Sequence, residues 1–255
     1  MRIELQSVTK KYLGQVALSN VTTNLAEGSV IAVLGVNGAG KSTLLKCLST
    51  QIQCTCGEIF MDSEPLRRAN IHQRRRLHFL PDFPYLVPHI DPVAYVGMVL
   101  DAYGIGSQEV SESREDCTLE VKQIAAKVAN LFKEFSLLGC EAEPMSSLSR
   151  GQQYKTALTA MIALDRELWL LDEPFASGMD PLGIKAFKRN ARHAAERGRT
   201  IVYTTQILEI VETFADQVLV LNAGKLVAAG TLSEVRELAT DTKSLQSFFE
   251  QFQPE

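Results

Sequence analysis

A glycine-rich stretch, GVNGAGKS, occupies residues 35 to 42 and joins three glycines to a lysine and a serine. It fits the spacing GxxxxGK[ST], in which glycines let the backbone wrap closely around phosphate oxygens, so that backbone N–H groups face the negative charge. Lys41 adds a positive charge for the β- and γ-phosphates, and the Ser42 hydroxyl is placed to hold Mg²⁺. The alternative is a glycine-rich turn without a ligand. We therefore expect a nucleotide and Mg²⁺ at this loop.

A pair of acids ends the apolar run LWLLDE, residues 168 to 173. The carboxyl end of a parallel strand is where α/β sheets bind ligands, which is the edge that also carries the phosphate loop. Asp172 is expected to reach the Mg²⁺ shell, and Glu173 to orient or deprotonate an attacking water. Two acids in such a place are more often a helix cap or a solvated turn, but the phosphate loop favours the catalytic interpretation.

The elements that position these residues are short apolar runs that alternate with helical patterns, which is typical of an α/β sheet buried on both faces. The stretches IELQSV and QVALSNVTTNLAEG near the start predict half-exposed antiparallel strands. Apolar residues from Val121 to Phe135 recur every three or four positions and predict one long helix in a helical block within residues 92–165. Residues 106–117 are predicted to form the loop before it. The expected buried strands are residues 29–35, 167–172, 200–205 and 217–222.

The composition argues against several classes of protein. The 255 residues carry a net charge of -4, so the chain lacks the basic excess of nucleic-acid binders, and the run HQRRRLH is interpreted as a solvated face. Five cysteines without a CxxC pair indicate neither a zinc site nor a disulfide framework, which fits a reducing cytoplasm. Because no signal peptide or membrane-spanning run is recognised, membrane contact is expected only through a partner.

The motifs together resemble one family, the ATP-binding-cassette (ABC) ATPases of ABC transporters, over nearly the whole chain. GVNGAGKST resembles the family's Walker A loop, LWLLDE its Walker B strand, LSRGQQ (148 to 153) its signature sequence and SGMD (177 to 180) its D-loop. The resemblance implies bound ATP and Mg²⁺, with Tyr12 stacked on the adenine. The implied nucleotide-binding residues are Tyr12, Asn37, Gly38, Ala39, Gly40, Lys41, Ser42, Thr43, Ser149, Gly151 and Gln152.

The same resemblance implies the architecture. It is a P-loop NTPase core of class α/β with a mainly parallel sheet, an N-terminal antiparallel β-subdomain and an inserted α-helical subdomain. The expected ATPase domain covers residues 1–238, with the core at 1–84 and 166–238, the helical subdomain at 85–165 and a helical tail at 239–255.

The signature sequence can also be interpreted locally. Ser149 precedes an apolar segment and would by itself be a plain helix N-cap, while the N–H groups near Gly151 offer an anion-binding helix end. In the family this helix end binds the γ-phosphate held by a second copy. The resemblance therefore implies a homodimer that closes over two ATP molecules, and a lone subunit should hydrolyse ATP poorly.

Two positions depart from the family pattern. After TIVYTT the family usually has a histidine that contacts the γ-phosphate, and this chain has Gln206, whose amide can still donate but cannot carry a charge. In HFLPDFPYL the family's Q-loop commonly has glutamine, and this chain has Asp82, whose oxygens suit Mg²⁺. The catalytic residues are thus expected to be Lys41, Glu173 and Gln206, and the metal ligands Ser42, Asp172 and Asp82.

An acidic Q-loop residue and the segment from residue 217 to 235 resemble ATPases of bacterial ABC exporters with separate membrane subunits. The family's membrane permease docks near this loop, which implies contact around Phe83–Ile90 and a position on the inner face of the cell membrane. The alternative function is an ATP-gated dimeric clamp with weak hydrolysis that serves a soluble assembly or a regulatory partner. DNA-repair ATPases of the superfamily are less favoured, since the chain has no long coiled-coil insertion.

Overall fold

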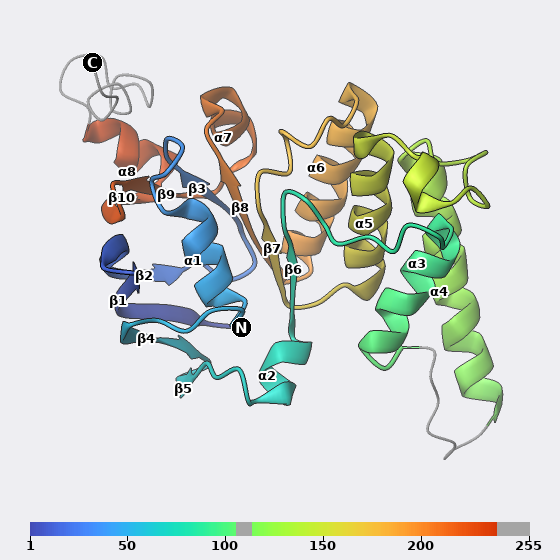
Figure 1. Ribbon diagram of the computed structural model, residues 1–255, viewed down its shortest axis with the longest axis horizontal. Coiled ribbons are helices and arrows are strands. Elements are labelled where there is room, and N and C mark those ends of the chain that lie inside the picture. The colour runs from blue at the N-terminus through green and yellow to red at the C-terminus, as the bar shows by residue number, and fades with distance from the viewer. Residues whose placement is uncertain (106–113, 239–255) are drawn as a thin grey trace. The chain divides into compact units, whose positions relative to one another are not determined.

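The computed structural model describes residues 1–105 and 114–238, the second range with side chains from Val121 onward (Figure 1). The chain divides into two compact units. Unit 1 comprises Met1–Phe79, Glu167–Pro174 and the chain from Ala191 onward, and unit 2 comprises Leu80–Arg166 and Phe175–Asn190.

An antiparallel sheet of four strands begins unit 1, in the order β2-β1-β4-β5. Ile3, Leu5 and Val8 of β1 are fully or almost fully buried, whereas the strand ends on the exposed Tyr12, so the strand presents one face to the core. The half-exposed antiparallel strands predicted near the N-terminus are confirmed. The strands are β1 (Ile3–Tyr12), β2 (Gln15–Leu25), β4 (Cys56–Met61) and β5 (Glu64–Pro65).

A larger sheet of six strands has the order β10-β9-β3-β8-β7-β6. Strand β3 pairs in parallel with β8 and β9, β7 pairs in parallel with β8, and β10 is antiparallel to β9. Every residue of β3, β7 and β8 is buried, which explains their nearly unbroken apolar sequences. The strands are β3 (Val30–Leu34), β6 (Leu77–Leu80), β7 (Leu168–Leu171), β8 (Thr200–Thr205), β9 (Gln217–Asn222) and β10 (Lys225–Thr231).

The helices of unit 1 are short, and α1 is the one that matters for the site. It begins directly after the glycine-rich loop, and its Leu44, Leu45 and Leu48 are completely buried in the core that both sheets share. This packing holds the start of the helix at the carboxyl ends of the parallel strands. The helices are α1 (Lys41–Leu48), α2 (Ile71–Arg75), α7 (Leu208–Phe214) and α8 (Leu232–Glu237).

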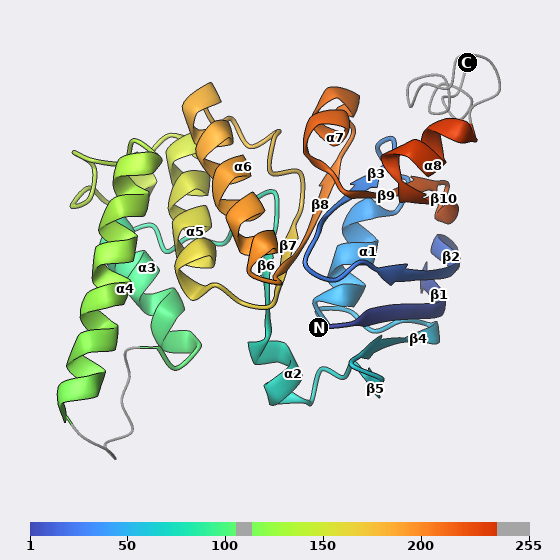
Figure 2. The ribbon, with the colours of Figure 1, turned by 180° about the vertical axis from the view of Figure 1, so that it is seen from behind.

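Unit 2 is built around α5, of which all but three residues are buried. Both ribbon views show α5 between α6 on one side and the pair α3 and α4 on the other (Figures 1 and 2). The sequence places the helical subdomain at 85–165, whereas unit 2 also takes in Leu80 to Pro84 and the start of α6. Its helices are α3 (Pro92–Ala102), α4 (Arg114–Glu134), η1 (Met145–Ser147), α5 (Arg150–Leu164) and the first part of α6 (Pro181–Glu196).

The predicted helix through Val121 and Phe132 is present as α4, but the loop predicted for residues 106–117 is wrong in part, because the helix already begins at Arg114. The helix start could not be recognised from the sequence, because that stretch is polar and shows no apolar period. Residues 106–113 and the predicted tail 239–255 lie outside the described residues. Within the described ranges, no helix is long and apolar enough to cross a membrane.

Candidate functional site

The glycine-rich loop connects β3 to α1. Its Gly40 has φ +105°, and a Cβ built there would lie 2.5 Å from the backbone oxygen of Ala17 in β2. Gly38 also has a positive φ, +82°, but faces open space. The N–H of Ala39 donates to the oxygen of Val36 inside the loop at 3.1 Å. Glycine at residue 40 is therefore required by contact with β2, and glycine at residue 38 by the backbone conformation alone. Asn37 is exposed beside Gly38, and Thr43 is half-buried in the first turn of α1.

The Lys41 ammonium group is buried beneath this loop, with 6% of the side chain exposed. Its Nζ donates to the oxygens of Gly35 at 2.9 Å and Val36 at 3.3 Å. It also forms an ion pair with Oε1 of Glu173 at 3.1 Å. The charge predicted to meet phosphate is thus held by three acceptors from the chain itself.

Asp172, which follows β7, accepts two hydrogen bonds on one carboxylate oxygen. Ser42 Oγ donates to Oδ1 at 3.0 Å, and Thr204 Oγ1 of β8 donates to the same oxygen at 2.7 Å. Thr204 in turn accepts from the backbone N–H of Glu173 at 2.8 Å. One buried hydroxyl therefore positions both acids. The sequence analysis missed Thr204, although a threonine in an otherwise apolar buried strand was a usable signal.

The oxygens of Ser42 and Asp172 fit a magnesium ion. Octahedral Mg²⁺ with ligands at about 2.1 Å places neighbouring ligand oxygens about 3 Å apart. The 3.0 Å between Ser42 Oγ and Asp172 Oδ1 matches one edge of such an octahedron. A hydroxyl and a carboxylate are hard oxygen donors, which leaves the other positions to phosphate and water.

Gln206 and Tyr12, two further predicted contact residues, belong to unit 1. Because Leu34 pairs with Thr205, the exposed Gln206 lies level with Gly35, the first residue of the loop. Tyr12 ends β1 with 42% of its surface exposed. The Nζ of Lys10 lies 5.0 Å from the centroid of the Tyr12 ring. Both predicted contact residues are therefore exposed to solvent.

In unit 2, Ser149 is the N-cap of α5 and forms a capping box with Gln152. The N–H of Gln152 donates to Ser149 Oγ at 3.2 Å, and the N–H of Ser149 donates to Gln152 Oε1 at 2.9 Å. A Cβ at Gly151 would lie 2.4 Å from the backbone oxygen of Gly178. The predicted N-cap is therefore present, and the residue after Arg150 must be glycine so that the D-loop can pack on the helix.

A second contact joins α5 to the D-loop. Lys155 Nζ donates to Oδ2 of Asp180 at 2.9 Å, and only 5% of the lysine side chain is exposed. This hydrogen bond, with further bonds from backbone N–H groups, holds the pKa of the Asp180 carboxyl below its usual value. The sequence analysis missed Lys155, since a lysine inside a helical pattern is usually solvated.

Asp82, the predicted metal ligand, forms an ion pair with Arg150. The Arg150 guanidinium donates to Oδ1 of Asp82 at 2.7 Å and lies 4.1 Å from the centroid of the Phe83 ring. Asp82 of the loop after β6 is therefore in contact with the first residue of α5. The sequence analysis singled out Asp82 but missed its pairing with Arg150.

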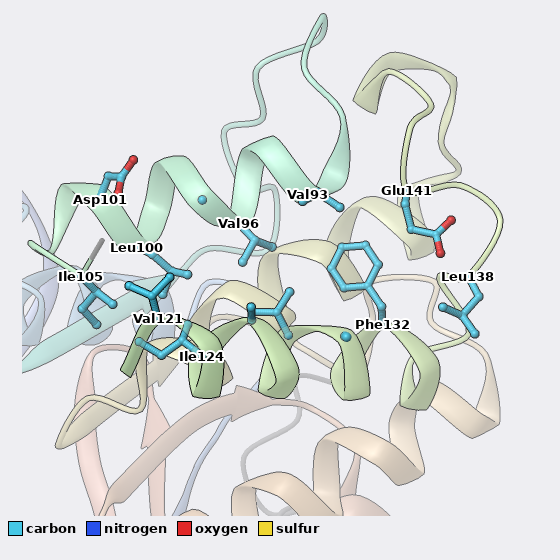
Figure 3. Close-up of a pocket in the computed structure, with 14 residues that line it drawn as sticks. Val93, Val96, Leu100, Asp101, Ile105, Val121, Ile124, Phe132, Leu138 and Glu141 are labelled. Carbon is cyan, nitrogen blue, oxygen red and sulfur yellow. The ribbon is translucent and has the colours of Figure 1, made fainter. Parts of the chain in front are cut away.

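The segment from Phe83 to Ile90 exposes aromatic surface: 69% of Phe83 and 87% of Tyr85 are accessible. It leads into α3, which forms one wall of an apolar pocket of about 420 Å³. Figure 3 shows the other wall, α4, with Val121, Ile124 and Phe132 pointing into the pocket. The apolar stripe predicted for α4 is thus only partly covered within unit 2.

Comparisons with known proteins agree on one family. The family model described as "ABC transporter" matches residues 18–176. The nickel import ATP-binding protein NikO of Rhodobacter capsulatus is 34% identical, over 91% of this chain and 90% of that protein. A putative ABC transporter ATP-binding protein of Methanothermobacter thermautotrophicus is 29% identical, over 92% of this chain and 81% of that protein.

Two solved structures share the fold. An ATP-binding subunit of an ABC transporter superposes with a TM-score of 0.86 at 25% identity, covering 99% of both chains. A dimeric ATP-binding cassette in a post-hydrolysis state with ADP and Pi gives a TM-score of 0.74 at 22% identity, covering 90% of this chain and 98% of that one.

Proposed function

The chain belongs to the ABC transporter family, as an ATP-binding subunit with ATPase activity, and we propose that it powers a separate membrane permease by closing as a dimer over ATP. The observation that carries the proposal is the cluster in unit 1 where the buried Lys41 meets Glu173 while Ser42 and Thr204 hold Asp172. A phosphate-binding cation, a metal-binding oxygen pair and a candidate base meet there at one sheet edge.

Nucleotide binding requires Lys41 to exchange partners. Its Nζ now contacts Gly35, Val36 and Glu173, and a bound triphosphate offers oxygens of higher negative charge than the two carbonyls. When Lys41 turns to phosphate, Glu173 loses its ion-pair partner. The Glu173 carboxylate is then available to orient and deprotonate a water, while its backbone stays bound to Thr204.

Ser42 and Asp172 hold the metal in this proposal. Bound Mg²⁺ supplies positive charge that offsets the charge on the phosphate oxygens during transfer. Asp82 remains our third proposed ligand. Its carboxylate must first release Arg150, to which it is now bound, before it can bind the metal. Gln206 is proposed to donate its amide N–H to the γ-phosphate. Loss of such a donor costs ~10² to 10³ in rate, and substitution of a neutral amide for imidazole costs less than that.

The second copy supplies the rest of the site. We propose that the N-terminus of α5, with Ser149, Gly151 and Gln152, faces the γ-phosphate bound by the partner copy. The capping box leaves other N–H groups of the first turn directed out of the helix, and the helix dipole favours an anion there. Support comes from the dimeric fold relative in a state with ADP and Pi.

The permease is proposed to contact unit 2 around Phe83–Ile90 and the pocket between α3 and α4. The pocket is apolar along its length, and Figure 3 shows the carboxylates of Asp101 and Glu141 at its two ends. An amphipathic helix with an apolar face and basic flanks matches this pattern. Through that contact the subunit would lie on the cytoplasmic face of the membrane.

The direction of transport is a separate proposal. Export, which the sequence led us to expect, finds no support in the relatives, and the Rhodobacter capsulatus relative is named for nickel import. We therefore propose import as the direction to test first. With nickel as the substrate to test, cells without this chain should accumulate less nickel from the medium. Greater accumulation of nickel in these cells would favour export instead.

The motor is tested by steady-state Mg-ATPase activity of the purified protein at high concentration, beside Glu173→Gln and Gln206→His. Turnover by the parent that Glu173→Gln abolishes supports the motor. A silent parent that Gln206→His activates supports the alternative, an ATP-gated clamp. Co-purification of the chain with a multi-spanning membrane protein separates the two further, because the clamp predicts a partner without membrane segments.

A further inference from the structure

Two cysteines of unit 1 lie together at the far end of α1 from the nucleotide loop. Cys47, in the last turn of α1, is 3% exposed and belongs to the main apolar core. Cys54 packs against the same core and is partly exposed. Both residues line one small cavity, and each thiol shifts the pKa of the other.

The chain between them is folded back tightly. The N–H of Thr50 donates to the oxygen of Cys47 at 3.0 Å, and the N–H of Ile52 donates to the oxygen of Lys46 at 3.2 Å. Lys10 Nζ of β1 then holds the oxygen of Gln53 at 2.9 Å. These bonds hold the segment that leads to Cys54 against the last turn of α1.

A small polar cavity opens onto both sulfurs. Its volume is about 170 Å³, several times the ~30 Å³ that one water occupies in the liquid. Arg67, Arg68 and Glu58 contribute to its lining, and Arg67 is paired with Glu58. A small oxidant can therefore reach the pair from solvent through a largely cationic opening.

The surroundings shift the pKa values of the two thiols in opposite directions. The neighbouring Cys47 thiol, together with the charges of Lys10 and Arg67, lowers the pKa of Cys54 to about 7, against the opposing effect of burial. The neighbouring Cys54 thiol and burial raise the pKa of Cys47. At neutral pH, Cys54 is thus substantially thiolate and nucleophilic, while Cys47 keeps its proton.

We propose that Cys54 and Cys47 form a redox-modification site, in which a peroxide oxidises Cys54 and Cys47 then closes an intramolecular disulfide. The Cys54 thiolate attacks one peroxide oxygen, the O–O bond breaks, and the leaving hydroxide takes a proton to become water. The Cys47 sulfur, on losing its proton, attacks the Cys54 sulfenic sulfur, and the S–O bond breaks to release a second water. One peroxide is reduced to two waters for each disulfide formed.

The disulfide affects α1, because its sulfurs must approach to about 2.05 Å, well inside any non-bonded contact. Cys47 lies in the same eight-residue helix as Lys41 and Ser42, whose core residues are tightly packed. Movement of Cys47 in the last turn of α1 therefore displaces the first turn of the same helix. We expect the oxidised protein to bind nucleotide more weakly by about three- to tenfold. This consequence, unlike the oxidation chemistry, rests on the proposed function.

The test uses the full chain treated with hydrogen peroxide, followed by intact mass and peptide mapping, with and without a reducing thiol. Wild type is expected to become lighter by two hydrogens and to yield a Cys47–Cys54 linked peptide that reduction reverses. Cys56→Ser, the control at an exposed neighbouring cysteine, should behave like wild type. Cys54→Ser should form no such link.

Because a core substitution at Cys47 can disturb folding, Cys54→Ser and Cys56→Ser are the decisive pair. Faster labelling of Cys56 than of Cys54 by a neutral alkylating reagent at pH 7, or a linked peptide that omits Cys54, would overturn the proposal. Nucleotide titration of the reduced and oxidised protein tests the coupling separately. A linked protein with unchanged nucleotide affinity would overturn the effect on α1. The mapping needs no nucleotide, so failure of the proposed ATPase function leaves its result intact.

Discussion

Lys41 Nζ lies 3.1 Å from Oε1 of Glu173, so the proposed phosphate-binding cation and the proposed base of the ATPase neutralise each other when no nucleotide is bound. Both side chains are largely buried, with 6% and 18% exposed. The pair satisfies a buried ammonium that would otherwise be costly, and it makes ATP binding a competition with Glu173 for Lys41.

The first prediction concerns Glu173→Gln. Removal of the carboxylate should lower ATP turnover by ~10² to 10⁴, because the water loses its base. ATP affinity should rise, since Lys41 no longer has to leave an anionic partner. Titration with ATP and a steady-state phosphate assay measure both quantities. Glu196→Gln, at an exposed position on α6, is the matched control. Weaker ATP binding by the Glu173 variant would contradict the competition.

The second prediction concerns Thr204→Val, a change of nearly equal size in β8. It removes the hydroxyl that donates to Asp172 and accepts from the N–H of Glu173. We expect the free energy of unfolding to fall by about 1–3 kcal/mol and ATP turnover to fall more than the stability loss explains. Thr200→Val is the control, because Thr200 lies buried at the other end of the strand and bonds to Gly28 instead. Equal effects of both variants on turnover would count against a positioning role for Thr204.

The third prediction concerns the Asp82–Arg150 pair, whose side chains are 30% and 46% exposed. An exposed ion pair contributes about 0.2–1 kcal/mol, and stacking of Arg150 on Phe83 cancels from a double-mutant cycle, because both Arg150→Ala variants lose it. A cycle of Asp82→Ala and Arg150→Ala in denaturant unfolding should therefore give a coupling of about 0.2–1 kcal/mol. Arg75→Ala, at another exposed arginine, should show no coupling to Asp82→Ala. A coupling indistinguishable from that control would mean that the contact does not stabilise unit 2.

The fourth prediction is a pH dependence from the Lys155–Asp180 pair. The pKa of Asp180 is lowered in the folded protein, mainly by the hydrogen bond from Lys155. The folded state therefore binds this proton less readily than the unfolded state, so the stabilisation is present above the ordinary carboxyl pKa of about 3.9 and is lost as pH falls through the lowered value.

Asp180→Asn should accordingly destabilise the protein at pH 7, where Lys155 keeps a buried charge without its anion. The difference from wild type should shrink below pH 4. Urea unfolding at a series of pH values measures it. Asp101→Asn, at an exposed carboxylate on α3, should show no such pH-dependent difference. A constant difference between wild type and Asp180→Asn across the series would refute the linkage.

Much of the fold follows from local pattern. The buried strands that include Val33 and Leu170, the antiparallel strands near Ile3 and the long helix through Phe132 are all present, because burial imposes a visible period on the sequence. The start of α4 escaped prediction, since Arg114 begins a turn without an apolar period. The N-cap at Ser149 was predicted. Its capping box with Gln152 could also be predicted from the sequence, because the two residues are three positions apart.

The sequence by itself determined which residues are candidates for the chemistry. Lys41 and Ser42 follow one strand, Asp172 and Glu173 follow another, and Ser149 stands at a helix start, so their spacing is set by the geometry of single elements. Only the tertiary structure decided which side chains meet. Lys41 with Glu173, Arg150 with Asp82 and Gly151 against Gly178 join separate segments. The packing of the core sets those distances, and no periodicity along the chain encodes which side chains the core brings within a few ångströms of each other.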